Sequence, residues 1–474
     1  MRTEATYDLV VLGCGAAALS AACSYADAAR GQGRAFRIAV VERATREGRG
    51  GATRWTSAWF RITEDRRLDP AFVESMGTIS AGLADLECCR TLEREVPHTL
   101  RFLEQHDVEL IYFKQPFPNR NTGGGLGMPL RGGLGIVDGL AGVVERTPGA
   151  NILYETEAVR LALGDAGAIE GVVVRRRDGT TSTLRARSVV IACGGFEGNP
   201  EMLTRYLGPR ACDLPVIAPT LANNTGDGIR MALEIGAACA GQFDMFHGEP
   251  VDARSRKPDA VVYAYPYGIV VNGRAERFYD EGKDSFDSTF EEIAFEIWRN
   301  QQQRAFFIGD QTTLGIEHVQ NIILTDQPPV SAPTLAELAG QLGLPPRALE
   351  RTVAEYNAAM GPGQFNAHVR DGRAARLTPP KSNWAFPLQS PPYIGYPLTC
   401  AITFTFGGVR TDSLARVITP TGAPVPGLYA AGEVTGLYYH QYPAGTSVLR
   451  AATFGRLAGA HAAAQHASAH SDAG

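Results

Sequence analysis

The sequence predicts an α/β fold organised around a parallel β-sheet, and three neighbouring segments carry that prediction. After Asp8, residues 9–12 form a short apolar run, an alanine-rich stretch follows to Arg30, and residues 38–41 form a second apolar run that leads into Glu42. Short continuous apolar runs between turn residues are typical of buried parallel strands, and the alanine-rich stretch favours a helix. Strand, glycine turn, helix and strand in this order predict a Rossmann-like nucleotide-binding unit.

The turn after the first run indicates where a dinucleotide binds. It reads Gly13-Cys14-Gly15-Ala16-Ala17-Ala18. Gly13 permits a tight turn, Gly15 lets the backbone approach a pyrophosphate, and Ala18 is small enough to replace the third glycine of the pattern. The N–H groups at the helix start favour phosphate oxygens, and Glu42 is placed to accept hydrogen bonds from ribose hydroxyls. The alternative is an α/β turn that holds no ligand.

Composition excludes several classes of protein. The chain has 474 residues, which suggests two or three domains or one large domain with an insertion, and 44% of them are hydrophobic, which suffices for a large core. The formal net charge of −5 argues against a nucleic-acid-binding surface. We expect a cytoplasmic protein without a membrane span, because no apolar run is long enough and no signal peptide precedes the first strand. The eight cysteines include no Cys-x-x-Cys pair, so we expect no metal site. His461, His466 and His470 are expected in a disordered terminus.

Four later segments place small residues where backbone can approach a ligand. Gly50-Gly51-Ala52-Thr53 follow a polar loop, and Ala192-Cys193-Gly194-Gly195 end a buried strand. Another strand ends in Ala431-Gly432-Glu433, and Gly445-Thr446-Ser447-Val448 precede the last helix. A turn of small residues before a helix directs N–H groups toward an electron-rich ligand. Asp227, near the start of another helix, is expected first of all to cap it.

The character of the sequence changes near Cys239. Residues 241–376 hold a strand-like piece, charged turns and several helical segments, and a proline-rich stretch then returns the chain to strands and a final helix. We therefore expect a nucleotide-binding domain formed by residues 1–240 and 377–474, with residues 241–376 inserted as a second domain.

In this order, the segments resemble the FAD-dependent dehydrogenases of the fumarate reductase and succinate dehydrogenase flavoprotein superfamily. The resemblance implies a Rossmann-like FAD-binding domain, an inserted α+β cap domain and an active site at their interface. Within this superfamily the chain most resembles tricarballylate dehydrogenase, through residues 277–282 with Asp284, residues 402–406, and Tyr439-His440 with Tyr442-Pro443. The ketosteroid dehydrogenases share Tyr-Pro-x-Gly at residues 442–445. The cofactor-binding residues implied are Gly13, Gly15, Ala16, Ala17, Ala18, Glu42, Arg43, Gly50, Gly51, Ala52, Thr53, Ala192, Gly194, Gly195, Asn224, Asp227, Gly432, Glu433, Gly445, Thr446, Ser447 and Val448.

Departures from the family pattern matter as much as the matches. Phe404 and Tyr442 stand where fumarate reductases carry a histidine and an arginine, and residues 283–286 lack their proton-donating arginine. These three differences argue against fumarate reduction. The cap-domain histidine of the family has a counterpart in His247. Residues 54–56 lack the histidine that tethers the flavin in membrane-bound relatives, so we expect noncovalent FAD.

Tyr442 and His247 are the principal candidates for chemistry. Forming a C=C bond beside a carbonyl group requires a base and donors for the enolate-like charge, and Tyr442 suits either role. Its alternative is a packing tyrosine. His247 is placed to anchor a carboxylate or to shuttle a proton, and its alternative is a structural histidine between domains.

Three arginines and several aromatic residues complete the candidate site. Arg131, Arg277 and Arg450 are candidate carboxylate-binding groups. Their alternatives are a surface arginine for Arg131, an ion pair with Asp280 or Glu281 for Arg277, and pairing within the FAD-binding domain for Arg450. Substrate contacts are predicted at Tyr112, Phe113, Phe404, His440 and Arg450. The predicted catalytic residues are Tyr442, His247, Arg131 and Arg277.

The expected function is FAD-dependent dehydrogenation of a small carboxylic acid, which removes a proton and a hydride from adjacent carbons. The first alternative is a desaturase or ene-reductase of a cyclic ketone, and the second is a flavoprotein subunit of an electron-transfer complex. Several arginines facing the flavin favour a polyacid, whereas one or none in an aromatic pocket favours a ketone. The expected electron acceptor is a quinone, oxygen or a redox protein.

Overall fold

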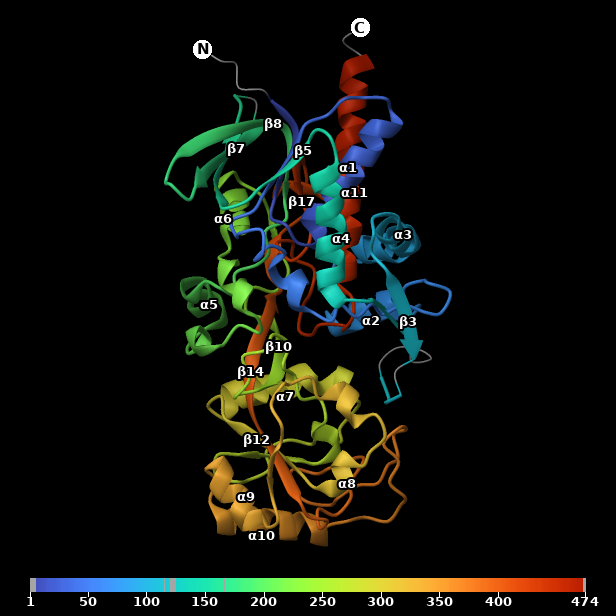
Figure 1. Ribbon diagram of the computed structural model, residues 1–474, viewed down its shortest axis with the longest axis vertical. Coiled ribbons are helices and arrows are strands. Elements are labelled where there is room, and N and C mark those ends of the chain that lie inside the picture. Colours follow the sequence, from blue (N-terminus) through green and yellow to red (C-terminus); the bar gives the residue numbers. More distant parts are fainter. Residues whose placement is uncertain (1–5, 115, 120–124, 166, 472–474) are drawn as a thin grey trace. The chain divides into compact units, whose positions relative to one another are not determined.

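The computed structural model describes residues 6–114, 116–119, 125–165 and 167–471 (Figure 1). The chain divides into two compact units. The first comprises Met1–Phe113, Gly125–His247 and Phe404–Gly474, and the second comprises Lys114–Gly124 and Gly248–Thr403. The second unit extends past residue 376, where the sequence suggested a return, because strand β14 (Tyr393–Thr405) pairs with β12 (Ala305–Gly309) of the same unit.

The first unit is built on an eight-stranded sheet with the order β16-β17-β8-β1-β2-β5, to which β7 and β6 are added beside β8. Five strands run parallel: β1 (Tyr7–Leu12), β2 (Ile38–Val41), β5 (Ala150–Leu153), β8 (Thr181–Ile191) and β17 (Pro424–Ala430). The others pair antiparallel: β6 (Thr156–Leu163), β7 (Ile169–Arg176) and β16 (Arg416–Ile418). This arrangement confirms the α/β fold that the sequence predicts.

Strand β1 lies in the middle of this sheet. Leu9 pairs with Ile38 of β2 on one side and with Ser188 of β8 on the other, and residues 9–12 are buried. A parallel strand covered on both faces needs an unbroken apolar run, which explains why this segment shows no alternation of polar and apolar residues.

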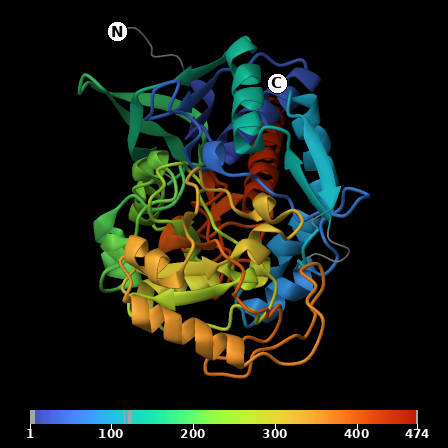
Figure 2. The ribbon, with the colours of Figure 1, turned by 60° about the horizontal axis from the view of Figure 1, so that its bottom comes forward.

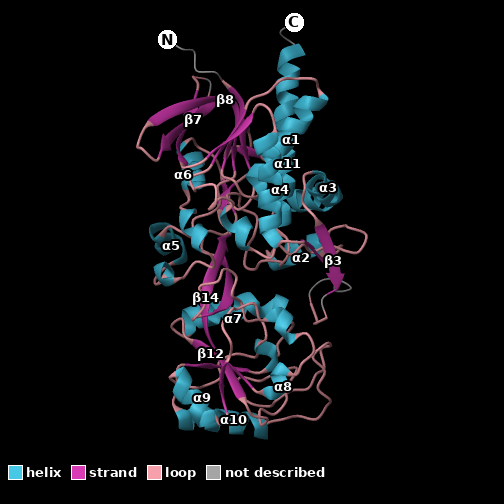
Figure 3. Ribbon diagram, viewed as in Figure 1, coloured by secondary structure: helices cyan, strands magenta, loops and turns pink. Residues whose placement is uncertain are grey.

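Helix α1 (Ala16–Gly31) packs along α11 (Ser447–Ser471), and α4 (Gly132–Arg146) lies beside α1 (Figures 1 and 3). Small residues permit this close packing, because a Cβ at Gly455 would lie 2.1 Å from the carbonyl oxygen of Ala17. The remaining helices of this unit are α2 (Phe72–Ile79), α3 (Leu86–Gln105), α5 (Pro200–Leu207) and α6 (Asp227–Glu234). Two short ribbons pair β3 (Leu110–Lys114) with β4 (Gly125–Pro129) and β9 (Cys239–Ala240) with β15 (Gly408–Val409).

The second unit contains most of a five-stranded sheet with the order β10-β14-β12-β11, with β13 also paired to β14. Its further strands are β10 (Phe246–Asp252), β11 (Ile269–Asn272) and β13 (Val330–Ala332). Its helices are α7 (Phe286–Asn300), α8 (Gln311–Leu314), α9 (Leu335–Leu342) and α10 (Pro346–Ala358). Helices α9 and α10, drawn in orange, lie side by side in both views (Figures 1 and 2).

The C-terminal segment differs from the sequence expectation. The prediction of a disordered terminus is wrong for His461 and His466, because α11 continues to Ser471. His461 forms a hydrogen bond with the hydroxyl of Tyr429 at 2.9 Å, and His466 forms one with Tyr25 at 2.7 Å. The alanine-rich composition favours a continued helix, and the hydrogen bonds of these histidines bind it to the rest of the first unit. Across the part of the chain that the structure describes, no helix has both the length and the apolar character that a membrane crossing requires.

Candidate active site

The glycine turn after β1 leaves no room for a side chain. Gly13 has φ +106°, and a Cβ at this position would lie 2.4 Å from the carbonyl oxygen of Ala192. The N–H of Gly13 donates to the carbonyl of Val41 at 2.8 Å. The positive φ and the close approach to Ala192 both require glycine at this position. The turn thereby lies between the end of β1 and the ends of β2 and β8.

The start of α1 has the features of a phosphate-binding site. Its N-cap residue, Gly15, has no side chain to cap the first turn. The N–H of Ala16 donates to the hydroxyl of Thr53 at 3.1 Å, so the loop of residues 50–53 lies against the glycine turn. Helix N-terminal N–H groups and the helix dipole favour a pyrophosphate, and the residues present here fit the phosphates of FAD.

Glu42 lies buried at the end of β2, with 8% of its surface exposed. One carboxyl oxygen accepts a hydrogen bond from the N–H of Ala44 at 2.8 Å. Burial raises the pKa of Glu42, and hydrogen bonds from the neighbouring backbone oppose that rise. A buried carboxyl group with remaining acceptor capacity fits the ribose hydroxyls of a bound nucleotide.

Arg43 is tied to its neighbours within the first unit. Its guanidinium donates to Asp227, Thr225 and Glu157, each at 2.8 Å. Burial opposes ionisation of Asp227, but hydrogen bonds from Thr225 and Arg43 hold the pKa of this carboxyl below its usual value. Asp227 thus anchors Arg43 at the start of α6, and its predicted capping hydrogen bond is absent from this helix.

Four further predicted cofactor residues converge beside the end of β8. A Cβ at Gly195 would lie 2.1 Å from a carboxyl oxygen of Glu433, and a Cβ at Gly194 would lie 2.5 Å from the amide nitrogen of Asn224. The carboxyl group of Glu433 accepts a hydrogen bond from the N–H of Thr405 at 2.9 Å. Glycines at 194 and 195 therefore allow these polar side chains to reach the strand end.

Tyr442 lies at the N-terminus of α11. Its phenolic oxygen accepts hydrogen bonds from the N–H groups of Thr446 and Ser447, both at 2.8 Å. The same hydroxyl donates to the side-chain oxygen of Ser447 at 3.1 Å. Two amide donors aimed at one oxygen favour negative charge on it and strengthen its own O–H as a donor.

Aromatic side chains surround Tyr442. The ring centroids of His247, Phe404 and Tyr438 lie 4.7, 5.0 and 5.2 Å from that of Tyr442. His247 and Phe404 are 4.9 Å apart, and His247 is 5% exposed. We call His247, Phe404, Phe406, Tyr438 and Tyr442 the aromatic cluster. The structure thus brings together three residues that the sequence singled out, namely Tyr442, His247 and Phe404.

Each of the three predicted arginines has partners within the protein. Arg131 has a 59% exposed side chain and pairs with Asp138 at 2.9 Å. Arg277, in the second unit, is buried and pairs with Glu281 at 2.5 Å while donating to the carbonyl of Pro379 at 2.6 Å. The structure therefore favours the surface role for Arg131 and the structural ion pair for Arg277 over catalytic roles.

Arg450 is also engaged by its own unit. It donates to the carbonyl oxygens of Thr435 and Gly432 at 3.2 Å, and its guanidinium lies 4.7 Å from the ring centroid of Tyr438. The contacts hold Arg450 beneath the aromatic cluster. This is the alternative in which it pairs within the FAD-binding domain.

The remaining predicted substrate contacts lie on other elements. Tyr112 and Phe113 are half-buried on β3, and the Tyr112 hydroxyl lies against Gly125 of β4. His440 is exposed, with φ +61°, and its N–H donates to the side chain of Gln242 at 2.6 Å. None of these contacts joins Tyr112, Phe113 or His440 to the aromatic cluster.

The sequence interpretation missed a buried ion pair that supports the Tyr442 loop. Arg61 and Asp69 are both 2% exposed at their side chains and lie 2.7 Å apart. Arg61 also donates to the carbonyl of Pro443 at 3.0 Å, and its N–H donates to that of Gly445 at 2.8 Å. The sequence did carry a signal for this pair, because an arginine inside the apolar run of residues 58–62 is expected to be buried and therefore to need an acidic partner.

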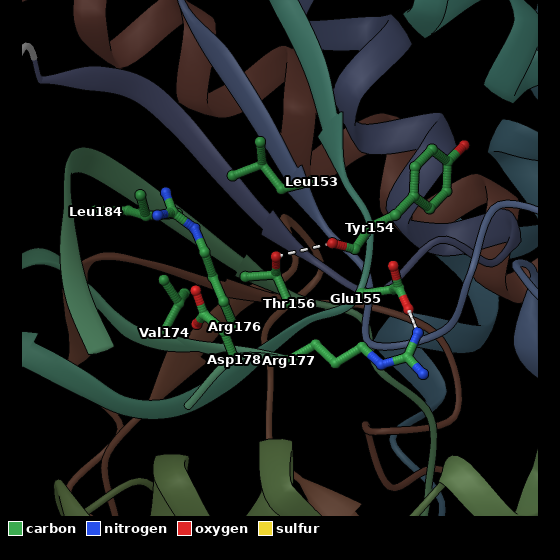
Figure 4. Close-up of a pocket in the computed structure, with 9 residues that line it drawn as sticks. All are labelled: Leu153, Tyr154, Glu155, Thr156, Val174, Arg176, Arg177, Asp178 and Leu184. Atoms are coloured by element: carbon green, nitrogen blue, oxygen red, sulfur yellow. Dashed lines mark hydrogen bonds and ion pairs between the residues drawn. The ribbon is translucent and has the colours of Figure 1, made fainter. Parts of the chain in front are cut away.

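An open hollow of about 480 Å³ lies elsewhere on the first unit, beside the hairpin of β7 and β8 (Figure 4). Arg177 pairs with Glu155 at 2.5 Å on its rim, and Leu153, Val174 and Leu184 add apolar surface. Its lining residues include no member of the aromatic cluster. The hollow is therefore separate from the candidate active site.

Comparisons with known proteins agree with this geometry. A family model described as an FAD binding domain matches residues 8–449. The chain is 32% identical over 326 residues to a 3-oxosteroid 1-dehydrogenase of Mycobacterium tuberculosis, a match that covers 63% of this chain and 57% of that protein. It is 27% identical to a 4-oxocyclohexanecarboxylate 2-dehydrogenase of Sinomonas cyclohexanicum, with 98% and 94% of the two chains covered.

Among solved structures, the chain is similar to the open conformation of a flavocytochrome c3 fumarate reductase, with a TM-score of 0.77, 22% identity, and 97% and 78% of the two chains covered. Matches to the first curated relatives span from 32% to 57% of those proteins' own length. The chain belongs to the FAD binding domain family, within the fumarate reductase and succinate dehydrogenase flavoprotein superfamily.

Proposed function

We propose that the chain is an FAD-dependent dehydrogenase that forms a C=C bond next to the carbonyl group of a cyclic ketone. The observation that carries this proposal is the Tyr442 hydroxyl, which lies among aromatic side chains and is contacted by two N–H groups at the start of α11. A site of this kind stabilises the negative charge that develops on a carbonyl oxygen when a proton leaves the adjacent carbon.

The residues that would hold FAD are those of the glycine turn with Thr53 for the phosphates, Glu42 for the ribose, and the strand end beside Glu433. Bound FAD supplies the oxidant, which accepts a hydride from the carbon β to the carbonyl. We propose noncovalent binding, because residues 54–56 read Arg-Trp-Thr and contain no histidine. Release of the flavin by denaturation without proteolysis would support this, and retention of the flavin by the denatured chain would contradict it.

Tyr442 is assigned as the electrophilic donor. Its O–H donates to the hydroxyl oxygen of Ser447, which lies 3.1 Å away. A ketone oxygen bound in the cluster would take the place of Ser447 as acceptor. The N–H groups of Thr446 and Ser447 polarise the phenol throughout, so the donor strengthens as the enolate-like charge grows.

His247 is assigned as the proton acceptor. Its ring packs edge-on against Tyr442, with a centroid separation of 4.7 Å and an interplanar angle of 62°. Imidazole is the side chain best suited to proton transfer near neutral pH. The substitution His247→Gln keeps a polar side chain there but removes the base, so turnover should fall by about 100-fold or more while FAD stays bound.

The substrate class follows from the arginines. A polyacid needs several guanidinium groups directed at its carboxylates, but Arg131, Arg277 and Arg450 each have protein partners. The aromatic cluster instead offers flat apolar surface, which suits a ring. The two dehydrogenases similar to this chain are named for ring ketones, and they support this choice over the small carboxylic acid that the sequence favoured.

We further propose that the second unit is the substrate cap, and that a quinone, oxygen or a redox protein reoxidises the enzyme. Support for the cap comes from its insertion between segments of the first unit in the chain. A truncated chain in which residues 248–403 are replaced by a short linker should retain FAD and lose ketone turnover. Loss of FAD together with the fold would instead favour a structural role for this unit.

The decisive experiment is an anaerobic titration of the purified flavoprotein. Addition of 4-oxocyclohexanecarboxylate or a 3-oxosteroid should bleach the visible band of the oxidised flavin, whereas tricarballylate should not. Bleaching by tricarballylate alone would restore the carboxylic-acid assignment. If no compound of either class bleaches a fully loaded protein, the alternative of an electron-transfer subunit is favoured.

A further inference from the structure

Two acidic side chains that have no part in the proposed reaction meet inside the first unit. Glu197 is 1% exposed, and its Oε1 accepts a hydrogen bond from the side-chain amide of Asn224 at 2.6 Å. Its other oxygen, Oε2, is buried and has no donor partner among the residues that the structure describes. A buried carboxyl oxygen without a donor needs a physical explanation.

Glu433 provides that explanation. Its side chain lies within hydrogen-bonding reach of Glu197, and its Oε1 accepts from the N–H and the hydroxyl of Thr405 at 2.9 and 3.2 Å. Two ionised carboxylates in contact repel each other, and a hydrogen bond between them requires that one carries a proton. One proton on Glu197 satisfies Oε2 and removes the repulsion.

The surroundings decide which carboxyl group is protonated. Glu197 receives one side-chain hydrogen bond, and burial followed by the charge of Glu433 raises its pKa well above the usual value. Burial also raises the pKa of Glu433, but hydrogen bonds from Glu197, Thr405 and the Gly195 backbone oppose that rise. On the adjacent helix α6, the charge of Asp227 is neutralised by Arg43. Among the described residues, the side-chain and backbone donors that contact the pair are neutral, and Glu433 accepts from more of them.

We propose that Glu197 is a positioning residue of the FAD site, which stays a neutral carboxylic acid and holds the Glu433 carboxylate against Gly195 by donating its proton to it. Glu433 is half-buried, directly follows Gly432, and is the side chain of the pair that remains accessible to a cofactor. The inference rests on the family's FAD binding and is independent of the proposed reaction.

The proposal makes FAD affinity depend on pH in a definite direction. While Glu197 keeps its proton, Glu433 is fixed and FAD binds tightly. When rising pH ionises Glu197, repulsion displaces Glu433 and the affinity falls. Because burial and the charge of Glu433 raise the pKa of Glu197, the loss of affinity is expected at a higher pH than an ordinary glutamate would give.

The substitution Glu197→Gln separates this role from simple packing. A glutamine amide donates to Glu433 and accepts from Asn224, has nearly the same volume, and does not ionise. Glu197→Leu keeps the volume but removes the donor. FAD dissociation constants of the deflavinated proteins, measured by fluorescence quenching from about pH 6 to about pH 9.5, should show a rise with pH in the native chain and a flat profile in Glu197→Gln.

At neutral pH, Glu197→Gln should bind FAD within about twofold of the native chain, and Glu197→Leu about tenfold more weakly, as expected for loss of a hydrogen bond to a charged group. Infrared spectra should show the carbonyl band of a buried protonated carboxylic acid in the native chain and lack it in Glu197→Gln. If Glu197→Leu does not fold, the infrared band and the pH profiles still decide. A native pH profile as flat as that of Glu197→Gln, or a missing infrared band, overturns the proposal.

Discussion

The phenolic oxygen of Tyr442 lies 2.8 Å from the backbone nitrogen of Ser447, the first residue of α11. This contact places the hydroxyl at the positive end of a helix dipole, in a loop whose backbone is strained on both sides. His440 and Ala444 have φ values of +61° and +52°, which residues with a Cβ seldom adopt. Strain of this kind persists where the surrounding structure enforces it, and it is frequently found at functional sites.

Removal of the Tyr442 hydroxyl tests its assignment directly. In Tyr442→Phe the ring still packs in the aromatic cluster, but the donor to the substrate carbonyl is lost. We expect turnover to fall by about 100-fold or more with FAD content unchanged, as measured by steady-state rates and the flavin-to-protein absorbance ratio. Turnover within about threefold of the native enzyme would remove Tyr442 from the mechanism.

The buried pair of Arg61 and Asp69 is expected to stabilise both the fold and the loop that carries Tyr442. Asp69→Asn leaves the Arg61 charge buried without its counter-ion, so unfolding in urea should show a loss of about 3 kcal/mol or more. The matched control is Arg131→Ala, which removes an exposed ion pair and should change stability by less than about 1 kcal/mol.

The turnover of the same two variants tests whether Arg61 and Arg131 contribute to activity. Asp69→Asn should also lower turnover, because Arg61 holds the carbonyl of Pro443 next to Tyr442. Arg131→Ala should leave turnover unchanged. A large loss of turnover in Arg131→Ala would return that residue to the list of catalytic candidates.

Local features of the fold were predictable because neighbouring residues encode them. The strands around Leu9 and Ile38 follow from apolar runs, and the turn at Gly13 follows from a backbone conformation that only glycine adopts readily. The FAD-binding assignment rests on such local segments occurring in a fixed order.

Partners of buried charges were not predictable from the sequence. Arg277 has acids at 280 and 281 nearby, and only the fold selects Glu281 as its partner. Glu197 and Glu433 are far apart in sequence, and their contact depends on how β8 and the segment after β17 pack. The end of the second unit was missed for a similar reason, because the long strand β14 is recognisable only by its pairing with β12.

Gly13 should tolerate no side chain. Gly13→Ala combines an unfavourable φ of +106° with a Cβ placed 2.4 Å from the oxygen of Ala192, so we expect a loss of about 3 kcal/mol or more and little bound FAD. Gly33→Ala is the control, because Gly33 also has a positive φ of +65° but no atom within 4 Å of its added Cβ. It should cost about 1 kcal/mol and keep FAD. Equal losses in the two variants would show that strain alone accounts for the effect.

Lys381 gives the second unit a distinct pH dependence. It is fully buried, donates to the carbonyl of Pro266 at 2.6 Å, and burial lowers its pKa from 10.5 to about 8. Between those values the unfolded chain binds more protons than the folded chain, so the contribution of Lys381 to stability rises with pH and is least favourable below about pH 8.

Comparison of the native chain with Lys381→Met isolates this effect, since methionine fills similar volume and does not titrate. The stability of the native chain relative to Lys381→Met should increase by about 3 kcal/mol between about pH 7 and pH 10.5, measured as the difference in free energy of unfolding in urea. Other titrating groups cancel in this difference. A difference that stays constant with pH would mean that Lys381 keeps its ordinary protonation in the folded protein, which would require that the attraction of Glu281 fully offsets the cost of burial.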